Sequence, residues 1–564
     1  IDPKKGSNTA IAEALTNIVF APLEKGLESV SLSANWMWPC NNPGEDARLY
    51  QAVQECSDFA IALGINIPTG KDSLSMKQKY PDGDVLAPGT VIISAAGQCK
   101  DVNQIITPVA RWNGGDFYYI DFAQDSFHLG GSSFAQSQDR IGTETPCVQD
   151  ATYFKTAFNA IQDHISEGKI TSGHDIGSGG LITTLLELCF PSTSIGMQLD
   201  FSGLEETDLV KILFSEKVGV VLQSTEDLTA SFTKAGIRAL KIGSVSDQNE
   251  LTVGSFRFSI AEMRKTWMTT STRLEAQQTR ADLATIRSVN IVKQPLKFQF
   301  PDHFDGKKPV PKSNRIKAAV IREKGSNSER EMAYMMDLSG FEVRDVHMTD
   351  LIEGRETLED IRLLVAVGGF SNSDVLGSAK GWAGAFKYNP KAKKALEDFF
   401  QRPDTLSLGV CNGCQLFVEL GLLTPPDRPQ PRMLHNDSGK FECIFTAVTI
   451  ETSSSIMLQG LEGSTLGIWA AHGEGKFSFP QSENHYQIPA KYLYHDYPSN
   501  PNGSDYNAAM LTSSDGRHLV MMPHLERSTF PWNWAHYPAQ RKDEVSPWIL
   551  AFENAYKWLK YSVV

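Results

Sequence analysis

The chain has 564 residues, of which 41% are hydrophobic and 21% are charged. A chain of this length is too long to fold around one hydrophobic core, which favours three domains, or four at most. No apolar run approaches the roughly 20 residues that span a bilayer, which disfavours a membrane protein. The 66 acidic and 53 basic side chains leave a net charge of -13, which disfavours nucleic acid as a partner because a phosphate backbone would be repelled.

The cysteines indicate a reducing compartment, and we expect a cytoplasmic location. They are mostly isolated in apolar or mixed surroundings, unlike a disulfide framework, and no signal peptide precedes the first helix. Residue 1 is Ile, not Met, so we expect the chain to begin inside a larger protein. The eight cysteines are Cys40, Cys56, Cys99, Cys147, Cys189, Cys411, Cys414 and Cys443.

Residues 1–112 form the first predicted domain, which mixes helices and strands. Apolar side chains recur at helical spacing over residues 9–20, where Glu13 and Asn17 share one face of the helix. Further along, the pattern predicts a strand at 29–32, a helix at 44–64 and a buried strand at 90–96.

Residues 113–268 form the second predicted domain, and residues 269–314 a linker. Strands are expected at 117–122 and 218–222, with helices at 151–165 and 181–188. The linker is polar first and then rich in Pro and Lys, a composition typical of segments that run over a surface.

Residues 315–564 form the last predicted domain, where strands and helices alternate. Such alternation predicts a parallel sheet covered by helices. No GxxxxGK[ST] phosphate loop occurs, so any ATP site must be of another kind. The expected strands are 317–321, 341–346, 363–367 and 519–522, and the expected helix is 329–338.

The segment GVCNGCQLF (residues 409–417) follows a strand and begins an amphipathic helix. Glycines on both sides of Cys411 permit the sharp turn of a nucleophile elbow, and the helix N-terminus favours a thiolate. Cys411 and Cys414 could instead form a CxxC redox pair or half of a zinc site. No second CxxC or paired-His cluster completes a metal set, which favours the nucleophile.

Two further segments fit a Cys nucleophile. His524 and Glu526 follow a buried strand, where catalytic loops of parallel sheets lie, and could act as base and orienter. Backbone N–H groups after Gly368 and Gly369, with that of Asn412, could stabilise an oxyanion. A lone His-x-Glu or a Gly-Gly turn is weak evidence by itself.

Five ordered segments resemble the class I glutamine amidotransferase domain of the formylglycinamide ribonucleotide amidotransferases, a family also called phosphoribosylformylglycinamidine synthases. The resemblance implies a flavodoxin-like domain that takes ammonia from glutamine, with Cys411, His524 and Glu526 as its triad. The sequence departs from the family at Leu525, where many members have Pro, and at Asn372–Ser373, where Tyr-Gly is usual. The five segments are GGFSNSDVLG (368–377), GVCNGCQLF (409–417), AHGEGK (471–476), YPSNPNGS (497–504) and MPHLER (522–527).

The resemblance extends to residue 1. The segments AEALTN (12–17), LSANWM (32–37), GKDSLSM (70–76) and GHD (173–175) are similar to the second aminoimidazole-ribonucleotide-synthetase-like repeat of this family. Residues 1–112 and 113–268 would be its two lobes. The expected fold class is therefore a multidomain α/β and α+β chain.

The family also implies magnesium and ATP or ADP in this repeat. Glu13, Asn17 and Asp175 offer oxygen atoms of the kind that Mg²⁺ prefers, and they match the family's metal positions. Gly177 matches a nucleotide-contacting position, although the family usually has a Ser-Asp-Gly run after Asp175, and the segment Ile176-Gly177-Ser178-Gly179 lacks its acid. Without the resemblance, a solvated Glu and a turn Asp would be the plainer interpretation.

The family's reaction converts formylglycinamide ribonucleotide to the amidine in purine biosynthesis, with ATP and glutamine. Its N-terminal domain, linker and first repeat are absent from this sequence, so the chain is expected to supply a glutaminase and half of the synthetase, and to need the missing part as a partner. Three alternatives remain: another glutaminase-coupled ligase, a thiol redox or metal-binding module, and a scaffold that binds nucleotide without turnover.

Overall fold

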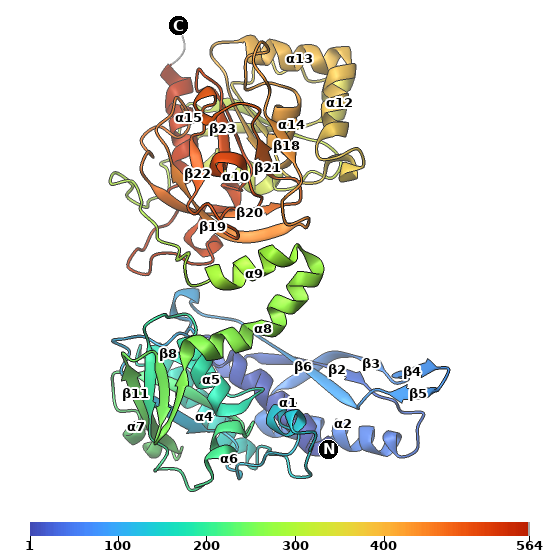
Figure 1. Cartoon of the computed structure of the whole chain (residues 1–564), viewed down its shortest axis with the longest axis vertical. Helices are drawn as coiled ribbons and strands as arrows, with labels where there is room; N and C mark the ends of the chain where they lie inside the picture. The colour runs from blue at the N-terminus through green and yellow to red at the C-terminus, as the bar shows by residue number, and fades with distance from the viewer. Residues whose placement is uncertain (562–564) are drawn as a thin grey trace. The chain divides into compact units, whose positions relative to one another are not determined.

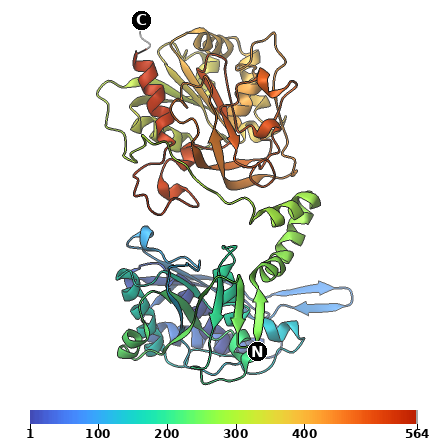
Figure 2. The same cartoon turned by 60° about the vertical axis from the view of Figure 1, so that its left-hand side comes forward.

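The computed structural model describes residues 1–561. The chain divides into two compact units, Ile1–Met268 and Thr269–Val564 (Figures 1 and 2). Within the described residues, every helix is too short or too polar to cross a membrane.

Unit 1 begins with two helices packed on a three-stranded sheet of order β3-β2-β6. Ile11, Leu15 and Leu63 are fully buried in the core that these elements share. A hairpin, β4–β5, extends from this sheet in both views (Figures 1 and 2). The strand predicted as buried, β6, is only half-buried, because Val91, Ile93 and Ala95 pack against this core while the side chains between them are exposed. The bounds are α1 Pro3–Ile18, β2 Val30–Met37, α2 Glu45–Leu63, β3 Asn66–Ser73, β4 Lys77–Tyr80, β5 Gly83–Leu86 and β6 Thr90–Gly97.

The rest of unit 1 is built on a seven-stranded sheet of order β13-β12-β9-β11-β7-β10-β8. Its pairs are antiparallel except β12–β9, and β7 and β10 carry almost entirely buried side chains. Asp175 ends β8 directly beside the start of β10, so this sheet edge collects polar side chains. The bounds are β7 Asp116–Asp121, α4 Ala151–Ser166, β8 Ser172–Asp175, α5 Gly180–Cys189, β9 Gly196–Leu199, β10 Gly219–Ser224, β11 Ala239–Ser246, β12 Glu250–Val253 and β13 Phe256–Ser259.

A long helix, α8 (Ile260–Gln278), runs across the division between the units and is followed by α9 (Ala281–Asn290). In unit 1, the Arg264 guanidinium donates to the carbonyls of Phe190 and Ser192, at 2.7 and 2.9 Å. The segment predicted as a linker therefore contains the end of α8 and all of α9. Its Phe298, Phe300 and Phe304 pack against the core of unit 2.

Unit 2 is built on a six-stranded sheet of order β15-β14-β16-β17-β24-β23. Five strands are parallel and the edge strand β23 is antiparallel, which agrees with the predicted parallel sheet. The central strands β16 and β17 are fully buried, as expected for a sheet covered on both faces. The bounds are β14 Ile316–Arg322, α10 Glu329–Leu338, β15 Phe341–His347, β16 Leu363–Ala366, α12 Lys380–Tyr388, β17 Leu406–Val410, α14 Asn412–Glu419, β19 Glu442–Ile450, β20 Thr465–His472, β23 Met510–Thr512, β24 His518–Met521 and α15 Ile549–Tyr561.

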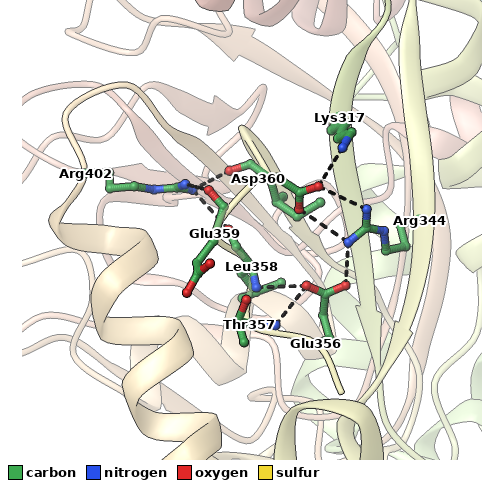
Figure 3. A network of polar contacts seen from close by, with 9 residues as sticks. Lys317, Arg344, Glu356, Thr357, Leu358, Glu359, Asp360 and Arg402 are labelled. Atoms are coloured by element: carbon green, nitrogen blue, oxygen red, sulfur yellow. Dashed lines mark hydrogen bonds and ion pairs between the residues drawn. The ribbon is translucent and has the colours of Figure 1, made fainter. Parts of the chain in front are cut away.

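A charged network holds the loop before β16 to the outer strands β14 and β15 (Figure 3). Arg344 contacts Glu356 at 2.7 Å and Asp360 at 3.2 Å, and Lys317 contacts Asp360 at 2.7 Å. Arg402 donates to backbone carbonyls of the same loop. These contacts fix the loop before β16 to its two neighbouring strands.

Candidate active site

Cys411 lies at the sharp turn between β17 and α14, at the carboxyl end of the parallel sheet. Its backbone has φ 52° and ψ -106°, a strained conformation for a residue with a side chain. The turn packs so closely that a Cβ on Gly413 would lie 2.0 Å from the Ala366 carbonyl oxygen. Glycine is therefore required there, and the thiol of Cys411 is lifted above the sheet.

His524 and Glu526 follow β24 and form a buried pair. The Nδ1 atom of His524 lies 2.6 Å from Oε1 of Glu526. Burial lowers the pKa of His524, but Glu526 and then Cys411 outweigh burial and raise the pKa to about 10. The same pairing holds the pKa of Glu526 below its usual value despite burial. Nε2 of His524 has no hydrogen-bond partner within residues 1–561, which leaves it available to a thiol or substrate.

Gly368 and Gly369 lie beside this pair. A Cβ on Gly368 would come within 2.8 Å of His524 Cε1 and 3.4 Å of Cys411 Cβ, so the glycine allows the two side chains to approach. Gly369 has φ 122°, and a Cβ there would meet the Gly325 carbonyl oxygen at 2.3 Å. Asn412 is the first residue of α14, where a backbone N–H has no partner within the helix. The structure therefore brings all six predicted residues of this site together.

A pocket of about 120 Å³ opens over Cys411. Several of its lining residues carry hydrogen-bonding groups that the sequence patterns did not single out. The Cys411 thiol donates to the Ala471 carbonyl at 3.6 Å, and Gln415 Nε2 donates to the Glu474 carbonyl at 2.8 Å. Burial lowers the pKa of His472 to about 3, with His524 adding to the shift, so His472 is neutral. Other polar residues of the lining are Asn327, Asp374, Ser378 and Arg527.

The loop after Gly369 is strained at the position where the sequence departs from the family. Asn372, Ser373 and Asp374 all have positive φ, of 52°, 57° and 48°. The Ser371 N–H donates to Oδ1 of Asn412 at 3.3 Å, which ties this loop to α14. The side chain of Asn412 thus helps to hold the loop against the turn.

The alternative of a CxxC redox or zinc site finds no support. Cys414 is fully buried within α14, and burial raises the pKa of its thiol well above the usual value. A thiol that stays protonated is a poor redox partner or metal ligand. In the part of the chain that the structure describes, no group of three or more His, Cys, Asp or Glu side chains is arranged to hold a metal ion.

In unit 1, the structure brings Glu13, Asp175 and Gly177 together. Oε1 of Glu13 lies 3.3 Å from where a Cβ on Gly177 would stand. Burial, Asp175 and then Glu216 raise the pKa of Glu13, so these carboxylates are close enough to repel one another. Asn17 is one helical turn after Glu13 and exposed on α1.

A neighbouring histidine was missed by the sequence patterns. His174 contacts Asp175 through Nδ1 at 3.1 Å and Glu187 through Nε2 at 3.1 Å. Burial lowers its pKa, but the two carboxylates outweigh this and raise it to about 9. His174 therefore places a positive charge beside Asp175.

A larger cavity of about 860 Å³ lies elsewhere in unit 1 and contains none of the predicted residues. Its wall includes the buried ion pair of Lys217 and Asp121, 2.8 Å apart. Arg238, which also lines it, pairs with Glu205 at 2.9 Å. Both basic side chains of this wall are therefore paired with carboxylates.

Three family models match the chain. Residues 315–559 match the CobB/CobQ-like glutamine amidotransferase domain, residues 1–98 the FGAR-AT PurM_N-like domain, and residues 125–255 the C-terminal domain of AIR synthase related proteins. The chain thus has a synthetase-like repeat of two lobes followed by a glutamine amidotransferase domain, as the sequence predicted.

Named relatives match along almost the whole chain. A probable phosphoribosylformylglycinamidine synthase of Arabidopsis thaliana, named chloroplastic/mitochondrial, is 40% identical over 99% of this chain and 42% of its own length. The phosphoribosylformylglycinamidine synthase of Homo sapiens is 37% identical over 99% of this chain and 45% of its own length. The chain therefore spans less than half the length of these relatives. A solved structure of PurLQS from Thermotoga maritima is 24% identical, covering 44% of this chain and 100% of its own, with a TM-score of 0.35.

Proposed function

We propose that this chain, a homologue of the phosphoribosylformylglycinamidine synthases over the part of their length that it spans, releases ammonia from glutamine at Cys411. The observation that carries the proposal is the strained turn that lifts Cys411 beside the buried pair of His524 and Glu526. A nucleophile, a base and an orienting carboxylate in this arrangement support acyl transfer.

The reaction follows from the positions of these groups. The raised pKa of His524 favours transfer of the thiol proton to Nε2 before the attack, and Sγ of Cys411, as the thiolate, then attacks the side-chain amide carbon of glutamine. The backbone N–H groups of Gly369 and Asn412 stabilise the oxyanion that forms. His524 then returns the proton to the leaving nitrogen, which departs as ammonia, and water hydrolyses the thioester to glutamate. Glu526 stabilises the imidazolium between the two proton transfers.

The ammonia is used in an ATP-dependent C–N ligation that converts formylglycinamide ribonucleotide to formylglycinamidine ribonucleotide in purine biosynthesis. This assignment comes from the names of the relatives, which are more than twice as long as this chain. The chain contributes the glutaminase and one synthetase-like repeat, and the ligation needs the remaining part of the enzyme as a partner.

The repeat in unit 1 binds ATP or ADP with Mg²⁺. Magnesium is usually held by one or two carboxylates, phosphate oxygens and water, and Glu13 with Asp175 fits this pattern because their mutual repulsion is relieved by a cation between them. Asn17 adds an amide oxygen, and Gly177 leaves room for the nucleotide. Magnesium would neutralise the phosphates there.

The location of the protein in the cytoplasm stays a prediction. The eight free cysteines support a reducing compartment, and they do not specify which one.

The test is glutamine hydrolysis by the purified chain, with the glutamine analogue 6-diazo-5-oxo-norleucine as a label. We expect wild-type chain to release ammonia and to be labelled on Cys411 alone, and the Cys411→Ser variant to do neither. A redox module would lose both Cys411 and Cys414 to thiol reagents and release no ammonia. A scaffold would keep its measurable activity in Cys411→Ser.

A further inference from the structure

Glu275, near the end of α8, is a carboxylate that joins several segments of unit 2. Its side chain is 17% exposed and lies 2.6 Å from Nη1 of Arg287 on α9 and 3.0 Å from Nζ of Lys440. The hydroxyl of Tyr497 lies 3.4 Å from the same oxygen and 3.1 Å from Oε1 of Glu442, so its one hydrogen is shared between the two carboxylates. A single carboxylate thus binds α9 and two loops of the glutaminase domain.

The charge on Glu275 is maintained by its surroundings. Burial raises its pKa, but Arg287 and Lys440 outweigh burial, and the pKa lies below its usual value. The two cations face Glu275 from different segments of the chain. Loss of the carboxylate charge would leave both of them without this partner.

Thr279, which directly follows α8, and Asn290, the last residue of α9, bind the backbone of the same loops. Thr279 Oγ1 donates to the Ser438 carbonyl at 2.7 Å, and Asn290 Nδ2 donates to the Tyr497 carbonyl at 2.8 Å. The loop of residues 436–440 is therefore fixed at both Ser438 and Lys440. A shift of this loop would break its contacts with Glu275 on α8 and with Thr279.

Asn436, at the start of this loop, holds the segment of residues 471–475. Asn436 is buried, and its Nδ2 donates to the His472 carbonyl at 2.7 Å while its Oδ1 accepts from the Gly475 N–H at 2.9 Å. Its backbone N–H donates to the Gly473 carbonyl at 2.9 Å. Three hydrogen bonds from one residue therefore set the position of this segment.

The segment of residues 471–475 forms one wall of the pocket over Cys411. Its Ala471 carbonyl accepts from the Cys411 thiol, and its Glu474 carbonyl accepts from Gln415 on α14. Ala471, His472 and Gly473 line the pocket. A shift of this segment would change both the surroundings of the thiol and the shape of the pocket.

We propose that Glu275 is a positioning residue for the glutaminase reaction, and that it acts through Lys440 and Asn436 on the segment of residues 471–475 beside Cys411. This inference rests on the proposed function. Glu275 itself does not line the pocket, so it acts by holding other residues in place.

The Glu275→Gln variant of the whole chain tests this role, because it keeps the shape of the side chain and removes its charge. We expect kcat/KM for glutamine hydrolysis to fall between about fivefold and a hundredfold, as small misplacements near a reacting group do. The rate at which iodoacetamide alkylates Cys411, measured by peptide mass without glutamine, should change at least about threefold. Glu275→Asp, which restores the charge, should recover part of both rates.

Lys440→Met is a second variant, which leaves the pair of Glu275 and Arg287 intact. Lys440→Met should lower kcat/KM and change the alkylation rate of Cys411 as Glu275→Gln does. The double variant should lose no more kcat/KM than Glu275→Gln alone, because both substitutions act through one contact. Glu462→Gln, at an exposed position of the same unit, is the matched control and should behave as wild type. Thermal unfolding of each variant identifies loss of the fold.

The inference is overturned if folded Glu275→Gln and Lys440→Met both keep kcat/KM and the alkylation rate within about twofold of wild type, well under the loss expected from misplacement. Failure of the proposed function gives a different result, since wild-type chain would then release no ammonia. In that case the alkylation rate of Cys411 still reports whether Glu275 positions the segment beside it.

Discussion

His524 and Glu526 lie 2.6 Å apart, between Nδ1 and Oε1, and their side chains are 2% and 0% exposed. A buried carboxylate beside an imidazole fixes the ring and favours its protonated form. The other ring nitrogen, Nε2, then points away from Glu526 and can exchange a proton with a thiol. This relationship accounts for the strongly raised pKa of His524.

The Glu526→Gln variant should lose most of its glutaminase activity while keeping its fold. Glutamine cannot stabilise the imidazolium, so the pKa of His524 should fall and kcat should drop by about 10²- to 10⁴-fold, the usual contribution of general acid–base catalysis. Steady-state ammonia release measures kcat. Glu462→Gln provides the control for the change of charge, and equal kcat in Glu526→Gln and wild type would show that Glu526 has no catalytic part.

The same pair should give unit 2 a defined dependence of stability on pH. The folded-state pKa of His524, about 10, lies above its unfolded value, so its contribution is complete below about pH 6.5 and is lost as pH rises towards 10. Glu526 has a lowered pKa, so its contribution is lost as pH falls below about 4.5. Unfolding of wild type and His524→Asn between about pH 5 and pH 10 should show a difference in Tm that declines with rising pH. A difference that grows with pH would contradict the assignment.

Gly368→Ala should damage the site without unfolding the chain. The added Cβ would lie 2.8 Å from His524 Cε1, so the ring must move, and kcat/KM for glutamine should fall by about a hundredfold. Gly384→Ala is the matched control, because its Cβ would meet only the Tyr388 ring at 3.9 Å. Wild-type activity in Gly368→Ala would mean that the ring need not occupy this position.

Glu13→Gln should change the response of unit 1 to magnesium. In wild type, Mg²⁺ with ADP should raise the Tm, because a ligand bound only to the folded state stabilises it. The variant has less repulsion from Asp175, so it should unfold at the same or a higher temperature without magnesium and gain little from it. Glu24→Gln, at an exposed position, is the control. Equal gains in wild type and Glu13→Gln would exclude Glu13 as a ligand.

Local patterns were sufficient for the elements that build the active site. The helix predicted at residues 329–338 coincides with α10, and glycines around Cys411 predicted the turn between β17 and α14. The helix α8 was not predicted, because the polar segment after Met268 resembles a linker in composition although its contacts are made with distant residues.

The residues that sequence reasoning missed depend on contacts between distant segments. Asn436 and Glu275 lie outside the conspicuous motifs, and each acts on residues that are far away in the sequence. His472 lies inside the AHGEGK segment, but only burial beside His524 reveals that it is neutral. Spacing along one chain carries no information about such pairs until the fold brings them together.

The covalent intermediate on Cys411 is the most direct test of the central claim. The whole chain is mixed with isotopically labelled glutamine, quenched in acid during turnover, digested and analysed by mass. The account predicts a γ-glutamyl thioester on the peptide that contains Cys411, attached to Cys411 and not to Cys414, and absent from Cys411→Ser. Ammonia release without any adduct on Cys411, or an adduct on Cys414, would contradict it.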